Sequence, residues 1–576
     1  MENQTLKILN RSVASDGNVT KKPFQFNVLL DGVKRKPSGR APPTLPPRAR
    51  PRLKSTPRLL GGLARFAAAF TSASVVAPHP PAAGRSVAMA GLWFLVAALF
   101  IFVPVCSWTF ADASVSLLCA GAALALVAVS LMWASRRRGG HDRRAVCVLV
   151  MGDLGRSPRM LYHSLSLARH GFSVTAVGYP GSKPHKDVLH NDKIKIVYLT
   201  EITTVTKFGP KIFQYGVKIV VQTLQICYAL LKINPPSYML LQNPPGLPAI
   251  AAVWVVCLLR GSKFIIDWHN YGYTIMGLTH GDHHPVVQIA KWYEHFFGKL
   301  SDANLCVTKA MREDLRVNWS IKAVTLYDSP SPIFREVPLE LQHKLFKKLA
   351  NDFVPFRART ESVPSNLEQT AFTELNTNTG NITHIRGRPA LLLSSTSWTE
   401  DEDFSILLKA LEEYERFITS GSKLPSLVCA ITGKGPLKEY YTNLIEKMHF
   451  KYVHICTPWL EAEDYPVLLG SGDLGVCLHK SSSGLDLPMK VVDMFGCRLP
   501  VCALDFQCLS ELVKHEENGL IFKNSHDLAE QLKLLFTDFH NEGNKLGVFK
   551  RNLKEAKMVQ WDENWDEMVL PLLASH

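Results

Sequence analysis

Lys490 and Asp493 stand three residues apart in the otherwise mostly apolar stretch LDLPMKVVDMFG, residues 485–496. Pro488 suits the first position of a helix, and the spacing then places the ammonium and the carboxylate on one face of its first two turns. The helix N-terminus and Lys490 would together bind a diphosphate, and Asp493 would accept hydrogen bonds from ribose hydroxyls. The alternative is a surface ion pair between the two side chains, which would be worth only about 0.3–0.5 kcal/mol.

A second candidate is the glycine-flanked cation at residues 433–436, where Gly433, Lys434 and Gly435 precede a proline. The stretch lies between a strand-like apolar run and a helix-like segment, so the glycines predict a flexible loop at the end of a strand. Such a loop, with its cation, suits a phosphate or the edge of a ribose, and an ordinary turn is the alternative.

A similar loop, GDLGRSP at residues 152–158, separates the first predicted strand from the first predicted helix. Gly152 and Gly155 let the backbone approach a ligand, and the N-terminus of the helix attracts anions. Arg156 or Arg159 is suited to contact a phosphate through two nitrogens. The spacing differs from the G-x-G-x-x-G dinucleotide motif, which disfavours a dinucleotide site, and an ordinary tight turn is the alternative.

Polar and aromatic side chains cluster in IDWHNYGYT, residues 266–274, at the end of a predicted buried strand. Active sites form at the carboxyl ends of such strands. His269 is suited to act as a general base there, because histidine titrates near neutral pH. The alternative is a structural histidine that caps the loop.

Two clusters resemble metal sites without predicting one. The three histidines of residues 280–284 have no nearby side chain that completes a ligand set. The acidic run 401–403 resembles a D-x-D metal motif, but Thr399 precedes Glu402 by three residues. That spacing is typical of a capping box, so we expect a helix to begin here.

The elements that must position these side chains alternate between strand and helix. One series runs from 145 to 330, and a second runs from 387 to 576 and ends in helices. The alternation predicts two parallel, doubly wound α/β domains in tandem. Such Rossmann-like domains bind ligands in the cleft between them, at the carboxyl ends of strands. The polar, proline-containing residues 331–386 are expected to be a linker or an insertion.

The N-terminal region differs in composition from the rest of the chain. Residues 1–88 are basic and proline-rich and lack a periodic apolar face, so we expect a disordered leader. Residues 90–134 contain two apolar runs that are separated by Asp112 and followed by five arginines. Each run is about 22 residues long, which predicts one or two transmembrane helices with the arginine end in the cytosol.

Charge and cysteine content exclude further classes of protein. The formal net charge of +15 resides in the N-terminal regions, so residues 145–576 are close to neutral. They lack the basic excess of a nucleic-acid-binding module. The 12 cysteines are scattered and show no zinc spacing, which indicates buried, reduced thiols.

Several stretches resemble one family over about residues 145–576. PMKVVDMFGCRLPV is similar to the P-x-K-x-x-E-Y-M-A-x-G-x-P-V stretch of GT-B nucleotide-sugar glycosyltransferases, with Asp493 where glutamate is usual. GDLGRSPRM, QNPPGLP, DWHNYGY and SSSGLDLPMK are similar to segments of the GT-B mannosyltransferases of the dolichol pathway. The resemblance implies a GT-B fold, in which two Rossmann-like domains face a cleft, here preceded by an N-terminal transmembrane anchor.

The resemblance also implies the reaction and its location. The donor would be GDP-mannose and the acceptor dolichyl diphosphate chitobiose, and the β-1,4 linkage would be made with inversion, without metal or other cofactor. This step adds the first mannose to the lipid-linked oligosaccharide for N-glycosylation. It would take place on the cytosolic face of the endoplasmic reticulum membrane, with other mannosyltransferases of the pathway as partners and no nucleic acid.

The resemblance further implies roles for single residues. Lys490 would stabilise the leaving diphosphate, and His269 would be the base, with Asp153 as the second candidate. The expected donor-binding residues are Gly433, Gly435, Asp486, Lys490 and Asp493, of which Asp486 would hold mannose hydroxyls. The first domain would take the acceptor, and the expected acceptor-binding residues are Gly152, Gly155, Arg156 and Asn270.

Two apolar helices are expected in the first domain, over residues 213–232 and 247–259. Both are candidates to lie near lipid, and the alternative is that they belong to the core. Two other functions stay open from the residues alone. One is a retaining GT-B transferase that uses another sugar nucleotide on a membrane lipid, and the other is an inactive membrane scaffold that binds nucleotide sugars.

Overall fold

The computed structural model describes residues 142–200, 211–359, 364–541, 543–556 and 560–574. The predicted leader, 1–88, and the predicted transmembrane region, 90–134, lie outside the described residues. Among the helices in the described ranges, none is long and apolar enough to cross a membrane.

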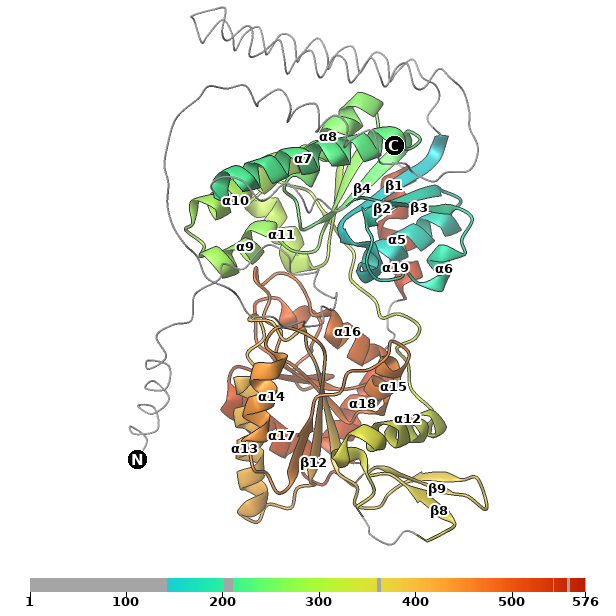
Figure 1. Cartoon of the computed structure of the whole chain (residues 1–576), viewed down its shortest axis with the longest axis vertical. Coiled ribbons are helices and arrows are strands. Elements are labelled where there is room, and N and C mark those ends of the chain that lie inside the picture. Colours follow the sequence, from blue (N-terminus) through green and yellow to red (C-terminus); the bar gives the residue numbers. More distant parts are fainter. Residues whose placement is uncertain (1–141, 201–210, 360–363, 542, 557–559, 575–576) are drawn as a thin grey trace, which may run out of the picture. The chain divides into compact units, whose positions relative to one another are not determined.

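The first domain is built on a seven-stranded parallel sheet with the order β3-β2-β1-β4-β5-β6-β7 (Figure 1). Its strands are β1 (Asp142–Asp153), β2 (Ser173–Tyr179), β3 (Ile194–Tyr198), β4 (Pro236–Asn243), β5 (Lys263–Trp268), β6 (Ala303–Cys306) and β7 (Val324–Thr325). The strand order reverses at β1, which lies between β2 and β4. The carboxyl ends of β1, β4 and β5 therefore border the position where doubly wound sheets bind ligands.

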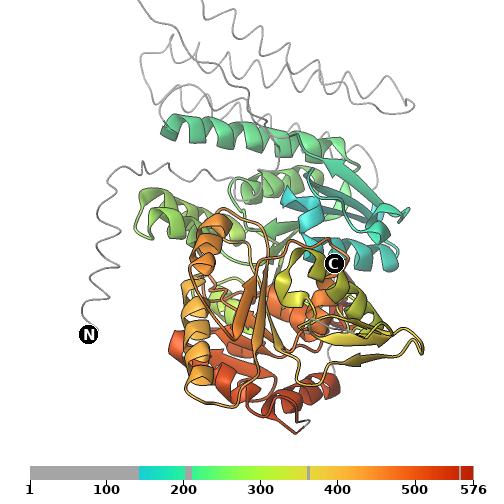
Figure 2. The same cartoon turned by 60° about the horizontal axis from the view of Figure 1, so that its bottom comes forward.

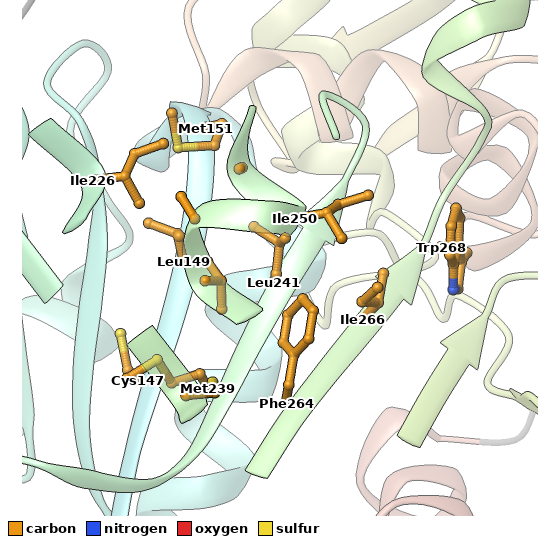
Figure 3. Packing of buried hydrophobic residues seen from close by; sticks show 14 of the residues in the cluster. Cys147, Leu149, Met151, Ile226, Met239, Leu241, Ile250, Phe264, Ile266 and Trp268 are labelled. Carbon is orange, nitrogen blue, oxygen red and sulfur yellow. The ribbon is translucent and has the colours of Figure 1, made fainter. Parts of the chain in front are cut away.

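The strands of this sheet are apolar on both faces because helices cover both. Along β1, Cys147, Leu149 and Met151 belong to one core cluster, whereas Val146 and Val148 belong to the other. Figure 3 shows the first of these clusters, with side chains from β1, β4 and β5 pointing to the same side of the sheet. This alternation explains the near-continuous apolar runs in the sequence.

Helices lie on both faces of the first sheet. Those with residues in the cluster of Figure 3 are α7 (Lys211–Lys232), α8 (Ala249–Arg260), α10 (Pro285–Gly298) and α11 (Lys309–Val317), and α9 (Gly272–His280) packs against α10. The other face is covered by α5 (Pro158–Arg169) and α6 (Lys186–Leu189), after the short 3-10 helix η1 (Leu154–Arg156).

The second domain contains a six-stranded parallel sheet with the order β13-β12-β11-β14-β15-β16. Its strands are β11 (Ala390–Ser395), β12 (Leu427–Thr432), β13 (Val453–Cys456), β14 (Leu474–Cys477), β15 (Val501–Leu504) and β16 (Gly519–Phe522). Its helices are α13 (Ser405–Thr419), α14 (Lys438–Glu446), α15 (Asp464–Ser471), α16 (Met489–Gly496), η3 (Leu509–Glu511), α17 (Ser525–Phe536) and α18 (Lys545–Glu555). Here the order reverses at β11, so the loops after β11, β12 and β14 form the corresponding edge.

Residues 331–386 contain regular structure in their described part. They form α12 (Leu339–Asp352), the 3-10 helix η2 (Val354–Phe356) and a small antiparallel sheet of β8 (Leu367–Gln369), β9 (Thr373–Asn376) and β10 (Ile382–His384). Phe346, Phe356 and Phe372 pack together and join a core cluster of the second domain.

The last two described helices, α19 (Trp561–Met568) and α20 (Leu570–Ala574), pack on the first domain rather than the second (Figure 1). Trp565 is fully buried in the cluster that contains Val146, and its indole N–H donates to Nδ1 of His163 at 2.9 Å. The hydroxyl of Tyr238, on β4, donates to the Leu573 carbonyl at 2.7 Å.

Two predicted helix starts differ from the observed ones. Pro488, predicted as the first helical residue, is the N-cap of α16, so the helix begins one residue later, at Met489. The capping-box prediction at Thr399 and Glu402 is wrong, because α13 begins at Ser405, behind the N-cap residue Phe404. Glu402 turns into the protein instead, where it has other partners.

Candidate active site

At the carboxyl end of β5, Asp267 is the centre of a buried polar network. Its carboxylate is fully buried and accepts from Arg159 through Nε at 2.8 Å and Nη2 at 3.0 Å. Burial raises its pKa, but the charge of Arg159 and the hydrogen bonds from His163 and His269 more than offset this and hold the pKa of Asp267 well below its usual range. Asp267 is therefore an anion that only accepts hydrogen bonds. Arg159, a candidate for a phosphate contact, is therefore bound inside the protein instead.

His269 lies on this carboxylate, with Nε2 at 2.9 Å from Oδ2 of Asp267. Since the carboxylate only accepts, Nε2 must carry the hydrogen, and the lone pair of the neutral ring is on Nδ1. The side chain of His269 is 23% exposed, so Nδ1 is accessible. The backbone N–H of His269 also donates to the Asn243 carbonyl at 2.8 Å, which fixes the start of the loop after β5 to the end of β4.

Asn270, the next residue, contacts the second domain. Its amide donates to Asp486 Oδ1 at 2.8 Å and to the Ser482 hydroxyl at 3.2 Å. The imidazole Nε2 of His479, in the loop after β14, lies 3.6 Å from Asp486 Oδ2. The structure thus brings an expected acceptor-binding residue and an expected donor-binding residue into direct contact.

Lys490 pairs with Glu402, from the loop between β11 and α13, and not with Asp493. The Glu402 side chain is 1% exposed and also accepts from the Thr396 hydroxyl at 2.6 Å and the Ser397 N–H at 3.2 Å. The alternative prediction, a surface ion pair between Lys490 and Asp493, is therefore wrong. A buried anion fixes the ammonium at the N-terminal turn of α16 instead.

Asp493 lies within electrostatic range of Asp328, which follows β7, the last strand of the first domain. It is mostly buried, and burial, followed by the charge of Asp328, raises its pKa to about 8. Asp328 is itself bound to Arg159, at 2.9 Å. Lys490 has the predicted diphosphate role and Asp493 the predicted ribose role. Their surroundings thus differ, although they lie one turn apart on α16.

The two glycines of the 433–436 loop allow the backbone to approach the loop after β11. A Cβ on Gly433 would lie 1.8 Å from the Thr396 carbonyl oxygen, and one on Gly435 would lie 1.7 Å from that of Ser397. Gly433 also has φ +147, a conformation that favours glycine. The glycines therefore hold the 396–398 loop, which binds Glu402, against the loop after β12.

The loop after β1 is organised by Asp153. Oδ1 accepts from the Gly155 N–H at 2.9 Å and Oδ2 accepts from the Ser182 N–H at 2.8 Å. A Cβ on Gly155 would lie 2.1 Å from the Ser182 carbonyl oxygen, so this glycine permits the contact between the two loops. Arg156 is exposed and donates to the Ser182 hydroxyl at 2.9 Å. Each oxygen of Asp153 thus accepts one backbone N–H.

Histidines and acidic residues do not gather into a metal site in the part of the chain that the structure describes. His284 caps α10 by accepting from the Val286 N–H at 3.3 Å. Nδ1 of His280 lies 3.3 Å from the Met276 carbonyl oxygen in its own helix. Both histidines thus have local, structural contacts.

Comparison with known proteins identifies the family. Residues 378–552 match the family model described as glycosyl transferases group 1. The chain is 60% identical to the Homo sapiens chitobiosyldiphosphodolichol beta-mannosyltransferase over 441 residues, covering 77% of this chain and 95% of the relative. It is 57% identical to the Mus musculus protein of the same name over 453 residues, covering 79% and 94%.

The chain belongs to the chitobiosyldiphosphodolichol beta-mannosyltransferase family. It is a mannosyltransferase, and its fold agrees with that assignment. A solved sucrose-phosphate synthase from Thermosynechococcus elongatus superimposes with a TM-score of 0.51 over 75% of this chain and all of that chain, at 11% identity. The two Rossmann-like domains of the GT-B fold, predicted from the sequence, are confirmed.

Three members of the site were missed in the assignment of roles from the sequence. Asp267 was visible as an acidic residue at a strand end, two positions before His269, and that spacing was the available signal. Glu402 was assigned to a cap because its spacing from Thr399 fits one. His479 lies two residues after the end of the strand β14, a position that could have singled it out.

Proposed function

We propose that this chain transfers mannose from GDP-mannose to chitobiosyldiphosphodolichol and forms a β-1,4 linkage with inversion. The observation that carries the proposal is the 60% identity over 441 residues to the human relative, whose name states the acceptor, the sugar and the β configuration. The donor and the position of the linkage are our additions. A GDP-mannose donor has an α linkage, so a single in-line displacement yields a β product.

The His269–Asp267 pair supports the chemistry at the acceptor. Nδ1 of His269 takes the proton from the 4-hydroxyl of the terminal N-acetylglucosamine while that oxygen attacks C1 of mannose. The bond from C1 to the diphosphate oxygen breaks, and GDP leaves with the bonding electrons. Asp267 holds the ring in one tautomer and stabilises the imidazolium that forms.

The donor binds on the second domain in this proposal. Lys490 and the N-terminus of α16 stabilise the negative charge that develops on the leaving diphosphate, and no metal ion is needed. Gly433 and Gly435 line the GDP pocket, and Asp493 bonds the ribose. Asp486 binds mannose hydroxyls, so its contact with Asn270 would join the donor site to the acceptor domain.

The test is an assay of the full chain in detergent, with a short-chain chitobiosyl diphospholipid acceptor and excess EDTA. GDP-mannose should yield a product that β-mannosidase cleaves, and UDP-sugars should yield none. An α-linked product would identify a retaining enzyme and overturn the proposal. The absence of transfer from any sugar nucleotide would favour a scaffold that only binds.

We also propose that residues 90–134 anchor the chain in the endoplasmic reticulum membrane, with residues 138–576 in the cytosol. The sequons at Asn3, Asn10 and Asn18 distinguish the two possible topologies. A single span places these asparagines in the lumen, where they would be glycosylated, and two spans keep them in the cytosol. Mobility before and after endoglycosidase treatment reports which arrangement exists.

A further inference from the structure

Three helices form one layer on the first sheet. Ile226 on α7, Val253 on α8 and Tyr293 on α10 lie in the same core cluster. The helices also pack on one another, α7 on α8 and α8 on α10 (Figure 1), and Figure 2 shows the long helix α7 lying over α8. The inner sides of the three helices therefore pack in the core, and their outer sides belong to one surface of the first domain.

That outer surface is apolar. Val220 and Leu224 lie one turn apart on α7, Leu258 lies on α8, and Ile289, Trp292 and Phe296 follow one another along α10; we call these six residues the outer apolar surface. Ile289 and Trp292 are each 60% exposed, and the Trp292 ring stacks on Phe296 at 5.6 Å. A helix that is apolar on both sides is unusual in water, and contiguous exposed patches mark interaction sites.

The charges on the helices of this surface are mostly positive, and the exposed Asp282 lies in the loop between α9 and α10. The sequences of α7, α8, α9 and α10 contain a single acidic residue, Glu294, and its side chain is buried against the N-terminus of α9. The same helices contain Lys218, Lys232, Arg260 and Lys291. Aromatic and aliphatic side chains beside several cations, with few exposed anions, are the composition of surfaces that lie on anionic membranes.

We propose that the outer apolar surface rests on the lipid bilayer, with its aromatic and aliphatic side chains in the headgroup–acyl boundary and the lysines near anionic headgroups. This contact is separate from the predicted anchor, and its purpose rests on the proposed lipid acceptor. The helix α9, which packs on α10, begins at Gly272, two residues after Asn270. A lipid-linked sugar would therefore reach the candidate site along a short path from the membrane.

The first test compares two acceptors with the full chain in phosphatidylcholine vesicles, with and without phosphatidylinositol. The variant combines Ile289→Gln, Trp292→Gln and Phe296→Gln. On a long polyprenyl acceptor in the vesicle, kcat/KM should fall about 10-fold or more, because each lost side chain weakens insertion. On a short-chain acceptor dissolved in water, it should stay within about two-fold of wild type, since α10 then has no membrane contact to lose.

A matched control removes equally exposed apolar side chains from the second domain, by Val354→Gln, Tyr440→Gln and Leu534→Gln. This control variant should leave the ratio of the kcat/KM values for the two acceptors unchanged. If the α10 variant lost kcat/KM equally on both acceptors, or lost it on neither, the proposal would be overturned. If wild type uses neither acceptor, the proposed function fails, and the next measurement still decides the membrane contact.

That measurement places p-benzoylphenylalanine at position 292 in the full chain and irradiates the vesicles. Adducts with radiolabelled phospholipid support the proposal, and a photoprobe at position 440 should yield none. Adducts with residues 90–134 would show that this chain's own apolar segment covers the surface. Adducts between two copies would show a dimer interface, and either protein adduct without lipid would overturn the proposal.

Discussion

The ammonium of Lys490 meets a carboxylate that is almost fully removed from water. Glu402 also accepts hydrogen bonds from Thr396 and Ser397, and Lys490 is the one cation that it contacts among the described residues. Loss of Lys490 would therefore leave a buried, uncompensated anion, which is expensive. The pair consequently stabilises the fold as well as serving the proposed leaving group.

We expect Lys490→Met to lower the free energy of unfolding by about 2–3 kcal/mol, less than for a fully buried pair because Lys490 is a quarter exposed. The double variant Lys490→Met, Glu402→Gln should recover most of that loss, because no unpaired charge remains, while activity stays low. Urea unfolding of wild type, the single and the double variant measures this. Equal stability of wild type and the single variant would contradict a paired Glu402.

His269 makes a sharper kinetic prediction. His269→Gln removes the proposed base and keeps a polar side chain near Asp267, so kcat should fall about 100- to 10,000-fold while the KM values stay near wild type. Steady-state kinetics with GDP-mannose and a soluble acceptor check this. Asp153→Asn is the comparison: a larger loss of kcat there than in His269→Gln would move the base role to Asp153.

Asp493 predicts a pH dependence of stability. Its pKa is raised to about 8 in the folded protein, so the folded state retains a proton that the unfolded state loses near its ordinary value. The stability present at low pH is then lost as pH rises from about 4 to about 8. Asp493→Asn cannot titrate, so its stability relative to wild type should increase across that range, measured by urea unfolding at several pH values. A constant difference would refute the buried, protonated carboxyl.

For single residues, the sequence predicted which ones belong to the candidate site better than it predicted which residues they contact. His269, Asn270 and Asp486 stood out because they follow apolar runs or precede a helix, and the structure brings two of them into contact. The partner of Lys490 is 88 residues away, and nothing in the spacing of Lys490 and Asp493 indicates it. Local spacing even favoured the wrong partner, since three residues on a helix suit an ion pair.

Loops at the edge of the second sheet hold the charged pair in place. The 433–436 loop lies so close to the 396–398 loop that neither glycine has room for a Cβ. The loop that binds Glu402 is therefore positioned by the loop after β12. Packing at this edge, and not only side-chain chemistry, determines where Lys490 is held.

Gly435→Ala should lower the free energy of unfolding by about 2–3 kcal/mol, because one loop must shift to accommodate the methyl group. It should also weaken GDP binding, measured by calorimetry on the full chain. The control is Gly216→Ala in α7, where a Cβ meets no atom within 4 Å. There alanine should stabilise by about 0.5–1 kcal/mol through helix propensity. Similar effects at both glycines would argue against the close loop contact.

Strands were the elements that the sequence predicted most directly, because a sheet covered on both faces needs continuous apolar runs. Helix starts were less accurate. The Thr399–Glu402 spacing fits a capping box, but Glu402 gains more contacts by turning inward. A tertiary contact of this kind overrides a local signal, and only the folded structure reveals it.

Across the whole described chain, Glu511 connects the two domains. Its carboxylate, at the end of η3, accepts the N–H groups of Lys309 and Ala310 at 2.8 and 2.7 Å, at the N-terminus of α11. It also accepts from the Tyr327 hydroxyl. The Thr308 hydroxyl adds a hydrogen bond to the Leu485 carbonyl, at 2.6 Å. The domains are thus joined beside the candidate site.

Glu511→Ala should weaken this connection by about 1–2 kcal/mol and reduce the fraction of closed molecules, so kcat/KM should drop about 10-fold. Binding of GDP to the second domain alone should change little. Small-angle scattering of the full chain and calorimetry check the two parts. Glu313→Ala, an exposed acidic residue on α11, is the matched control and should leave both unchanged. An identical effect of the two variants would exclude a role in domain closure.

The two-domain architecture was predictable because the strand–helix alternation restarts after residue 386. The place of the terminal helices was not. The sequence around Trp565 is amphipathic and would fit either domain, since any apolar surface of the right shape can bury such a helix. Only the cavity beside His163 and Val146 determines where it packs.

The position of α19 sets the order in which the protein can be completed. Although the strands of the first domain leave the ribosome early, Trp565 fills their core only after every strand of the second domain has been synthesised. A nascent chain must therefore keep an apolar gap in the first domain until residue 565 has been synthesised. A chain truncated shortly before Trp561 would keep the core of the second domain and lose part of the core of the first, so a late truncation would destabilise the domain that is synthesised early.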